Sequence, residues 1–272
     1  MRTLVHLSDL HFGRIDPATT DPLVERIEAA EPDVVVVSGD LTQRARRGQF
    51  RAARNFLDRL PGPRIVVPGN HDVPLYNLVA RFLFPLSSYR RFIDDDPAPF
   101  HRDEEIAIAG VNTARSLTWK GGRINADQVA ALRERLCGLE EGVVAVVVAH
   151  HPFDLPPGHG RRDLVGRARM AMEALAECGV DLFLTGHLHR HHVGHTAERY
   201  RIRDHAAVVV QAGTATSTRG RGERNSFNVV RISRDEIEVE PWLWRPDGGR
   251  FDVDAARPPI RFEREGGVWS PA

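Results

Sequence analysis

The sequence predicts an α/β fold in which a second, more antiparallel β-sheet packs on the first. Short apolar runs rich in β-branched residues alternate with helical patterns over roughly the first 185 residues. After residue 200 the pattern changes to successive strands separated by turns. With 272 residues, 42% of them hydrophobic, the chain is long enough for one large domain with a sizeable core.

Five apolar runs are predicted to be buried strands because each is short, continuous and ends abruptly in polar or glycine-containing sequence. They lie at residues 4–7, 34–37, 65–67, 143–148 and 182–184, with helical patterns at 21–30, 49–60, 127–136 and 167–178. Later strands are expected at 207–211, 227–232, 237–243 and 260–262. No repeat or long linker divides the chain, so we expect one domain over residues 1–256 and a Pro-rich surface tail over 257–272.

The charge balance gives no strong nucleic-acid signal. Lys+Arg and Asp+Glu number 37 each, so no global field draws the chain to nucleic acid or to an anionic membrane. Arginines at 44, 46, 47, 51 and 54 share a helical pattern with Phe50, Leu57 and Leu60, which is typical of a solvated helix face. No apolar stretch reaches the roughly 20 residues needed to span a bilayer.

The two cysteines, Cys137 and Cys178, lie near the ends of predicted helices and have no metal-binding spacing. They are therefore expected to be free, half-buried thiols in a reducing compartment. The first residues form a strand pattern and lack the basic start and apolar run of a signal peptide. Both features predict a cytoplasmic location.

The segment from Pro74 to Ile93 is rich in large apolar residues and is interrupted by Pro85. One interpretation is a kinked helical pair packed on the core. The alternative is an apolar lip beside the functional site that contacts an apolar substrate, a subunit or a membrane surface.

Metal-type side chains follow every one of the five predicted strands. In chain order they are Asp9 and His11, then Asp40, then Asn70, His71 and Asp72, then His150 and His151, and finally His187 and His189. In an open α/β sheet the carboxyl ends of the strands meet in one crevice. Each group alone is weak evidence, but together they would be costly to bury without a cation. The sequence therefore predicts a metal site.

The ordered set of Asp-x-His, Gly-Asp, Gly-Asn-His-Asp, His and Gly-His-x-His groups, from residue 9 to residue 189, resembles the calcineurin-like metallophosphoesterase superfamily. The compact length is similar to that of bacterial class III cyclic-nucleotide and glycerophosphodiester phosphodiesterases. The resemblance implies two facing mixed β-sheets flanked by helices, in four layers.

The resemblance also implies two divalent ions. Asp9, His11 and His189 would hold one ion, and Asn70, His150 and His187 would hold the other, with Asp40 bridging them. Carboxylate, imidazole and amide ligands suit Mn, Fe, Zn or Co. The implied reaction is attack of a metal-bound hydroxide on phosphorus.

Four residues are expected to face the substrate: Asn70, His71, His151 and Arg14. By resemblance, His71 would hydrogen-bond the phosphate or protonate the leaving oxygen, and the adjacent Asp72 carboxylate is placed to orient its imidazole. The loop 213–224, with Thr214, Thr216, Ser217 and Arg219, is a further candidate lining of the pocket.

The leading interpretation is a phosphodiesterase acting on a small diester, either a cyclic nucleotide or a glycerophosphodiester. One alternative is a pyrophosphohydrolase of a lipid-linked nucleotide, motivated by the apolar segment 74–93. Another is a DNA nuclease, which the short chain and the absence of basic bias disfavour. A metal-free scaffold is disfavoured because every expected ligand is present.

Overall fold

The computed structural model describes residues 1–200, 202, 205–219 and 222–272. Its first sheet contains β1 (Arg2–Leu7), β2 (Val34–Val37), β3 (Arg64–Val66), β10 (Ser226–Ile232), β11 (Glu236–Arg245), β12 (Arg250–Val253), β13 (Ile260–Glu265) and β14 (Val268–Pro271). Its second sheet contains β4 (Phe100–Arg102), β5 (Ile106–Val111), β6 (Val144–Ala149), β7 (Leu182–Thr185), β8 (His192–His195) and β9 (Val208–Gln211).

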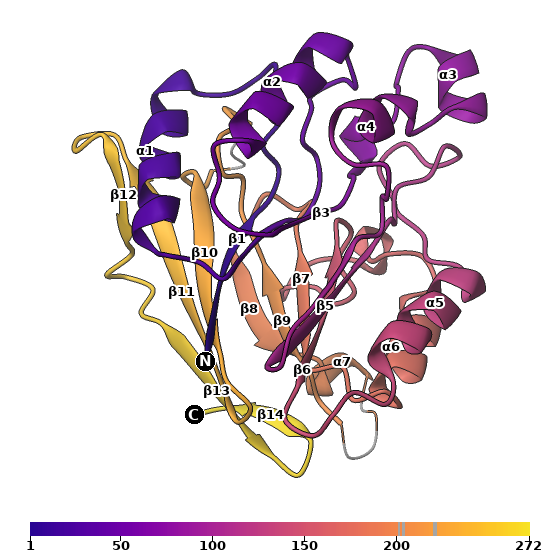
Figure 1. The fold of residues 1–272 in the computed structure, drawn as a ribbon, viewed down its shortest axis with the longest axis vertical. Helices are drawn as coiled ribbons and strands as arrows, with labels where there is room; N and C mark the ends of the chain where they lie inside the picture. Colours follow the sequence, from indigo (N-terminus) through magenta and orange to yellow (C-terminus); the bar gives the residue numbers. More distant parts are fainter. Residues whose placement is uncertain (201, 203–204, 220–221) are drawn as a thin grey trace.

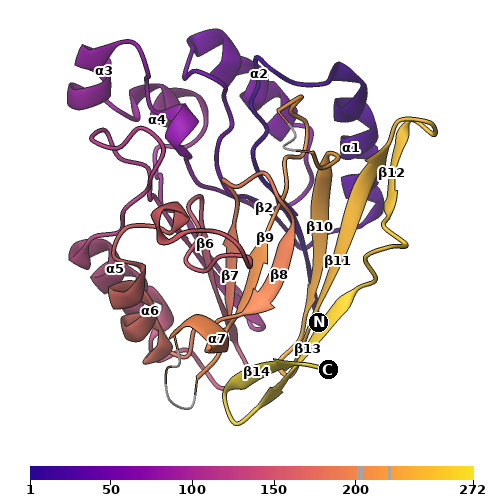
Figure 2. The same ribbon diagram turned by 180° about the vertical axis from the view of Figure 1, so that it is seen from behind.

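The helices are α1 (Pro17–Ala29), α2 (Arg47–Leu57), α3 (Leu78–Leu83), α4 (Ser87–Phe92), α5 (Ala126–Leu136), α6 (Ala168–Ala176) and α7 (Ala197–Tyr200). Short 3₁₀ turns cover Asn70–Asp72 and Arg161–Asp163. The two sheets face each other, with α1 and α2 on the outer side of one and α5 and α6 on the outer side of the other (Figures 1 and 2). The predicted fold of two mixed sheets flanked by helices is confirmed.

The continuous valine runs are explained by burial on both faces. Val34 and Val36 of β2 point into the core between the sheets, whereas Val35 and Val37 point toward α1 and α2. The second sheet follows the same alternation, because Val146 faces the other sheet and Val147 packs with residues of α5 and α6. Strands covered on both sides need no polar face, so they read as unbroken apolar sequence.

The strands are divided between the sheets differently from the prediction. The order of the first sheet is β14-β13-β11-β10-β1-β2-β3, with β12 paired to β11, and that of the second is β4-β5-β6-β7-β9-β8. The late strands β10 to β14 thus extend the sheet that β1 begins, and β1 pairs antiparallel with β10. The expectation that they form a separate sheet was wrong, because strand patterns do not specify which strands pair.

The buried strand β5 was not predicted, although it pairs with β6 along its whole length. Its sequence, IAIAGV, contains alanines and a glycine, which are depleted in strands and weaken the strand signal. Gly110 is required there, because a Cβ atom would lie 2.9 Å from both Pro99 Cδ and Val67 Cγ1.

The expected surface tail over residues 257–272 is also wrong. β13 pairs antiparallel with β11, and β14 pairs with β13. Phe262 and Trp269 are buried in the core between the sheets, and the Trp269 indole donates a hydrogen bond to Asp181 Oδ1 at 2.9 Å. The end of the chain is therefore part of the sandwich.

The segment 74–93 forms two short helices on either side of Pro85, as one of the two interpretations predicted. α4 packs on the body of the protein, where Tyr89 is fully buried and its hydroxyl donates to Val66 O at 2.8 Å. α3 lies at an outer corner beyond α4 in both views (Figures 1 and 2). Its large apolar side chains are exposed.

The cysteines are not free thiols, because Cys137 and Cys178 form a disulfide that joins the ends of α5 and α6. The two helices lie side by side on the second sheet, which brings cysteines 41 residues apart in sequence together. Disulfides are rare in reducing compartments. The argument for a cytoplasmic location from free thiols therefore does not hold.

Cys137→Ser is expected to lower the free energy of unfolding by about 2–4 kcal/mol under non-reducing conditions, because the cross-link restricts the unfolded chain. Denaturant titration with and without a reducing agent measures this difference. Equal stability of the wild-type protein in both conditions, with two titratable thiols in each, would show that the disulfide does not form.

Candidate metal centre

The structure brings together the side chains that follow β1, β2, β3, β6 and β7. β1, β2 and β3 are parallel in one sheet, and β6 and β7 are parallel in the other. Residues that follow strands of the two sheets are in contact, so all five strands end at the same edge of the sandwich. The predicted metal ligands Asp9, His11, Asp40, Asn70, His150 and His189 are buried, and His187 is half-buried. They form two adjoining clusters.

The first cluster contains Asp9, His11 and His189. Asp9 Oδ1 lies 3.0 Å from His189 Nε2 and 3.5 Å from His11 Nε2. The two imidazole nitrogens are 3.1 Å apart. Three atoms that can bind a metal ion, from residues that follow β1 and β7, thus lie close together.

The second cluster contains Asn70, His150 and His187. His150 Nε2 lies 3.2 Å from Asn70 Oδ1 and 3.3 Å from His187 Nδ1. The other nitrogen of His150 is 2.8 Å from Ser38 O, which fixes the orientation of the ring.

Asp40 lies between the clusters. Its Oδ2 is 3.7 Å from His11 Nε2 in the first cluster and 3.4 Å from His150 Nε2 in the second. Its Oδ1 accepts a hydrogen bond from the His71 backbone N–H at 2.8 Å. One carboxylate therefore faces both groups of donors.

Backbone strain is concentrated at these residues. Among the described residues, eight that are not glycine have a positive φ, and five of them are Asp9, His11, Asp40, His187 and His189. Such left-handed conformations cost energy for residues with a Cβ and are enriched at functional sites. Here they turn side chains at the strand ends into the common crevice.

Two glycines permit the close approach of the strand ends. A Cβ at Gly186 would lie 1.8 Å from Ser8 Oγ and 2.7 Å from Asp9 Oδ2. A Cβ at Gly69 would lie 2.2 Å from Asp40 Oδ1. Each glycine precedes a predicted ligand of one strand and contacts a predicted ligand of another, so a side chain at either position would push the clusters apart.

The donor set fits a pair of divalent cations. Asp9 Oδ1 is buried and has no hydrogen-bond partner, although the other oxygen accepts from Ser8 Oγ at 2.7 Å and from the His187 N–H at 2.9 Å. A buried carboxylate oxygen without a partner is costly, and a cation satisfies it. Oxygen and imidazole donors together suit first-row transition metals.

The electrostatics of the clusters favour ionised carboxylates. Burial would raise the pKa of Asp9 and of Asp40, but the neighbouring imidazoles, chiefly His189 and His150, lower both. Burial would lower the pKa of His150, but Asp40 raises it to about 9. Burial and His150 lower the pKa of His187 to about 3. The neighbouring imidazoles thus favour the ionised form of both carboxylates, as cations bound between them would.

The expected pairing of Asp72 with the His71 imidazole is not formed. Asp72 instead accepts hydrogen bonds from the backbone N–H groups of Leu41, Thr42 and Gly69 at 3.1, 2.8 and 2.9 Å. Burial and Asp40 raise its pKa to about 7. Asp72 therefore holds the loops after β2 and β3 together and does not orient His71.

The His71 ring is held by Gln43, which the sequence did not indicate, and by Arg219, which was predicted to line the pocket. Its Nδ1 lies 2.9 Å from Gln43 O, so Nδ1 carries the hydrogen and donates it. Its Nε2 lies 3.1 Å from Arg219 Nη1 and accepts from that guanidinium. Arg44, expected on a solvated helix face, precedes α2 and lies 3.4 Å from the ring. Two guanidinium groups therefore flank His71.

His151 belongs to the wall beside the second cluster. Its Nδ1 is 2.8 Å from Thr113 Oγ1 and its Nε2 is 3.0 Å from Lys120 O. Its ring centroid is 4.6 Å from that of His187. One ring nitrogen of His151 lies within 4.8 Å of ring nitrogens of His150 and His187, close enough for the three to share a cation. Both nitrogens of His151, however, already have protein hydrogen-bond partners. Its predicted role at the edge of the substrate pocket stays a prediction.

Arg14 contributes through its backbone. Its carbonyl accepts a hydrogen bond from Ser217 Oγ at 3.1 Å and from the Thr218 N–H at 3.1 Å, whereas its side chain is exposed. Thr214 and Thr216 donate to the carbonyls of Asp9 and Leu10 at 2.7 Å each. The loop 213–219 thus braces the turn after β1. Gly220 and Arg221 of the predicted loop lie outside the described residues.

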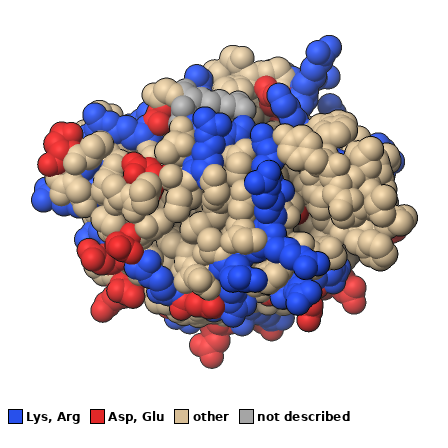
Figure 3. All heavy atoms as spheres, turned by 90° about the horizontal axis from the view of Figure 1, so that it is seen from above, with Lys and Arg blue, Asp and Glu red and all other residues tan. Residues whose placement is uncertain are grey.

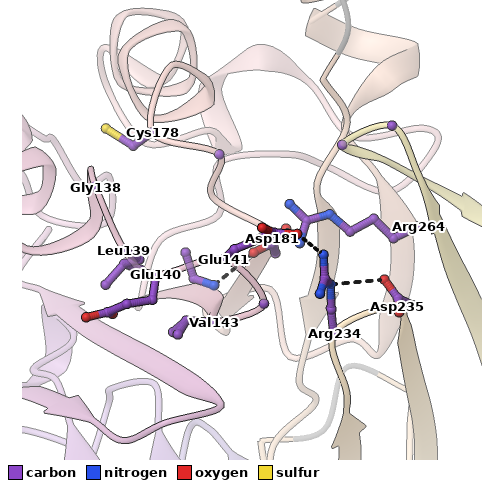
Figure 4. A pocket seen from close by; sticks show the side chains of 15 residues that line it. Gly138, Leu139, Glu140, Glu141, Val143, Cys178, Asp181, Arg234, Asp235 and Arg264 are labelled. Atoms are coloured by element: carbon purple, nitrogen blue, oxygen red, sulfur yellow. Dashed lines mark hydrogen bonds and ion pairs between the residues drawn. The ribbon is translucent and has the colours of Figure 1, made fainter.

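A separate hollow of about 400 Å³ lies at the opposite edge of the sandwich (Figure 4). It is lined by residues that precede β6 and β7, and none of the predicted site residues is among them. Asp181 Oδ1 lies 3.4 Å from Arg264 Nη1, and Arg234 pairs with Glu141 and Asp235. Because none of the residues predicted to bind metal or substrate lines it, this hollow is not the candidate site.

No helix in the described part of the chain has the length and apolar character needed to cross a bilayer.

Two curated proteins resemble parts of the chain. Glycerophosphodiester phosphodiesterase GpdQ of Enterobacter lignolyticus is 30% identical over 173 residues, which cover 59% of this chain and 60% of that protein. A probable cyclic nucleotide phosphodiesterase of Synechococcus is 25% identical over 201 residues, covering 69% of this chain and 73% of that protein. The chain therefore spans less than two thirds of the length of the Enterobacter relative.

The fold also occurs among solved structures. A dimetal phosphatase from Danio rerio superposes with a TM-score of 0.63 at 15% identity, covering 88% of this chain and 95% of that one. The family model described as calcineurin-like phosphoesterase matches residues 2–191, which include both clusters. The resemblance inferred from the sequence is confirmed, and the chain belongs to the calcineurin-like phosphoesterase family.

Proposed function

We propose that this chain is a two-metal phosphoesterase that hydrolyses a small phosphodiester. The observation that carries the proposal is the position of Asp40, whose Oδ2 faces the donor clusters of Asp9, His11 and His189 on one side and Asn70, His150 and His187 on the other. In a two-metal site a shared carboxylate holds the ions a few ångströms apart.

The proposed centre would bind Mn, Fe, Zn or Co. Ions bound there would lower the pKa of a water and neutralise the charge that develops on the phosphoryl oxygens. The chain itself orients the donors: Ser38 O holds His150, and Ser8 Oγ holds Asp9. The His71 ring lies beside the His11 ring, with Arg44 and Arg219 against it, and Asn70 belongs to the second cluster. These four residues would bind the oxygens of the phosphoryl group.

The substrate class rests on the two relatives, which are named for glycerophosphodiester and cyclic nucleotide hydrolysis. The proposed substrate is therefore a glycerophosphodiester or a cyclic nucleotide. A second candidate is a pyrophosphohydrolase of a lipid-linked nucleotide. The exposed apolar side chains of α3, whose neighbour Tyr76 lies 6.0 Å from the Arg44 guanidinium, favour this candidate.

A substrate panel distinguishes these functions. Protein reconstituted separately with Mn, Zn, Fe or Co is assayed on cyclic nucleotides, glycerophosphodiesters, phosphomonoesters and a lipid-linked nucleotide pyrophosphate. We expect the highest kcat/KM on a diester. A clear preference for the pyrophosphate would support the second candidate, and no hydrolysis of any phosphoester with any metal would contradict both.

Asp40→Asn is expected to lose at least one metal ion and to reduce turnover by more than the roughly 10–100-fold typical of residues that only orient metal ligands. The amide lacks the negative charge needed beside two cations. Elemental analysis and steady-state kinetics measure the two effects. Asp252→Asn on β12, where the carboxylate pairs with Arg250, is the matched control. Two retained ions and near-normal turnover would remove Asp40 from the bridge.

His187→Ala and His189→Ala are expected to deplete different metal positions, because the two imidazoles belong to different clusters. Anomalous scattering from crystals of each variant locates the remaining ion. His205→Ala is the control, since His205 precedes β9 at the opposite edge of the sheet. Loss of the same ion in both variants would contradict the assignment.

His71→Ala is expected to retain two ions while turnover falls by roughly 10²–10⁴-fold, the range for a positioned proton-transfer group. If His71 protonates the leaving oxygen, Arg219 must move away from Nε2 and that nitrogen must first take up a proton from solvent, because the ring hydrogen is on Nδ1. The defect must then be smaller on aryl than on alkyl diesters. An equal defect on both esters indicates that His71 stabilises the phosphoryl oxygens instead. A lost ion would show that His71 supports the metal centre.

A further inference from the structure

Most of the exposed large apolar residues in the described part of the chain are gathered at one corner. Eleven such residues are exposed in the described part of the chain, and six of them fall within residues 76–84. Two more, Leu117 and Trp119, lie on the loop that follows β5. Each of these eight side chains is more than half exposed. We call this set the α3 surface. Clusters of this kind on a protein surface mark interaction sites.

The α3 surface is held together by a buried arginine. The Arg81 side chain donates to Ser116 O at 2.7 Å, Pro74 O at 2.9 Å and Thr118 O at 2.7 Å, and it is only 1% exposed. Its guanidinium also lies 4.7 Å from the centre of the Trp119 ring. Because one side chain ties α3 to the loop 116–119, the two exposed apolar segments form a fixed surface.

The surroundings of this surface are cationic. Segment 74–93 contains Arg81, Arg90 and Arg91, segment 112–123 contains Arg115, Lys120 and Arg123, and neither contains an acidic residue. The nearest acidic residues along the chain are the buried Asp72, Asp94–Asp96 after α4, and Asp127 on α5. In Figure 3 this end of the molecule shows a band of Lys and Arg beside a broad area without charge.

The α3 surface adjoins the candidate metal centre on two sides. Lys120, next to Trp119, accepts a hydrogen bond from His151 through its carbonyl, and the His151 ring contacts the His187 ring. Arg44 lies between His71 and the Tyr76 ring. A layer bound to the α3 surface would therefore lie beside the phosphoester site.

We propose that the α3 surface docks this protein onto an anionic lipid surface. Apolar side chains that enter the interface beside lysine and arginine are the combination that binds anionic bilayers peripherally. A second copy of the chain is a poorer partner, because a two-fold contact would place the cations of these segments against their own copies. The inference concerns binding alone and does not depend on the proposed phosphodiesterase activity.

Vesicle binding tests the proposal with the whole chain. Flotation with phosphatidylcholine vesicles and with vesicles of equal parts phosphatidylglycerol and phosphatidylcholine should show binding to the anionic vesicles, weakened by salt. Trp119 should report insertion through a blue shift in fluorescence, because Trp242, Trp244 and Trp269 are buried. Trp119→Phe should remove that shift.

Two pairs of substitutions separate the apolar and cationic contributions. Phe82→Ser with Leu83→Ser should weaken binding roughly tenfold or more, because both side chains lose apolar area that would be buried. Lys120→Gln with Arg123→Gln should weaken it roughly fivefold for each charge. Ile260→Ser, an exposed apolar residue on β13, is the matched control and should change nothing. Thermal unfolding of each variant verifies that the fold is intact.

Three results would overturn the proposal. They are no binding to anionic vesicles at low salt, equal binding to neutral and anionic vesicles, and a concentration-dependent dimer that the Phe82 and Leu83 substitutions abolish without any vesicle binding. The last result would assign the surface to a second copy of the chain. None of these measurements uses turnover, so the proposed catalytic function is tested separately.

Discussion

The constraint on which this structure depends is the burial of two ionised carboxylates, Asp9 and Asp40, at one edge of a β-sandwich. Their charge is balanced chiefly by neighbouring imidazoles, most of which follow other strands, and one oxygen of Asp9 has no hydrogen-bond partner. Such an arrangement is stable when cations complete it. The parallel strands, the left-handed backbone at five ligand positions and the glycines beside them all serve to bring these donors within a few ångströms.

Each sheet contributes some of the residues of both clusters. Asp9, His11, Asp40 and Asn70 follow β1, β2 and β3, whereas His150, His187 and His189 follow β6 and β7. Neither sheet alone contains a complete cluster, because each cluster combines residues from both. The core between the sheets therefore sets the distance between the donors. The C-terminal strands β13 and β14 belong to the same assembly, since Phe262 and Trp269 fill that core.

Around the metal centre the structure adds a layer of residues that bind and orient. Gln43 and Arg219 hold the His71 ring, Thr113 and Lys120 hold the His151 ring, and Arg81 fixes the apolar corner beside them. These contacts are made largely by loops, where binding residues are positioned by a rigid scaffold. The proposed catalytic centre and the proposed lipid-binding surface consequently share one end of the molecule.

The sequence by itself determined the strand at Val34–Val37 and, to within one residue, the strand predicted at 143–148, which is Val144–Ala149 in the structure. It also indicated a two-sheet architecture and the set of side chains that meet at the strand ends, because buried strands and their polar termini are local patterns. It did not determine which strands pair, that residues 257–272 complete a sheet, or that Cys137 and Cys178 meet, since each depends on segments distant in sequence. The partners of His71 were decided in the same way. An adjacent Asp72 suggested one orientation, but the tertiary structure directs that carboxylate to the loop after β2 and leaves the imidazole to Gln43 and Arg219. Residues adjacent in sequence are close in space, but the packing of the surrounding loops decides the direction in which each side chain points.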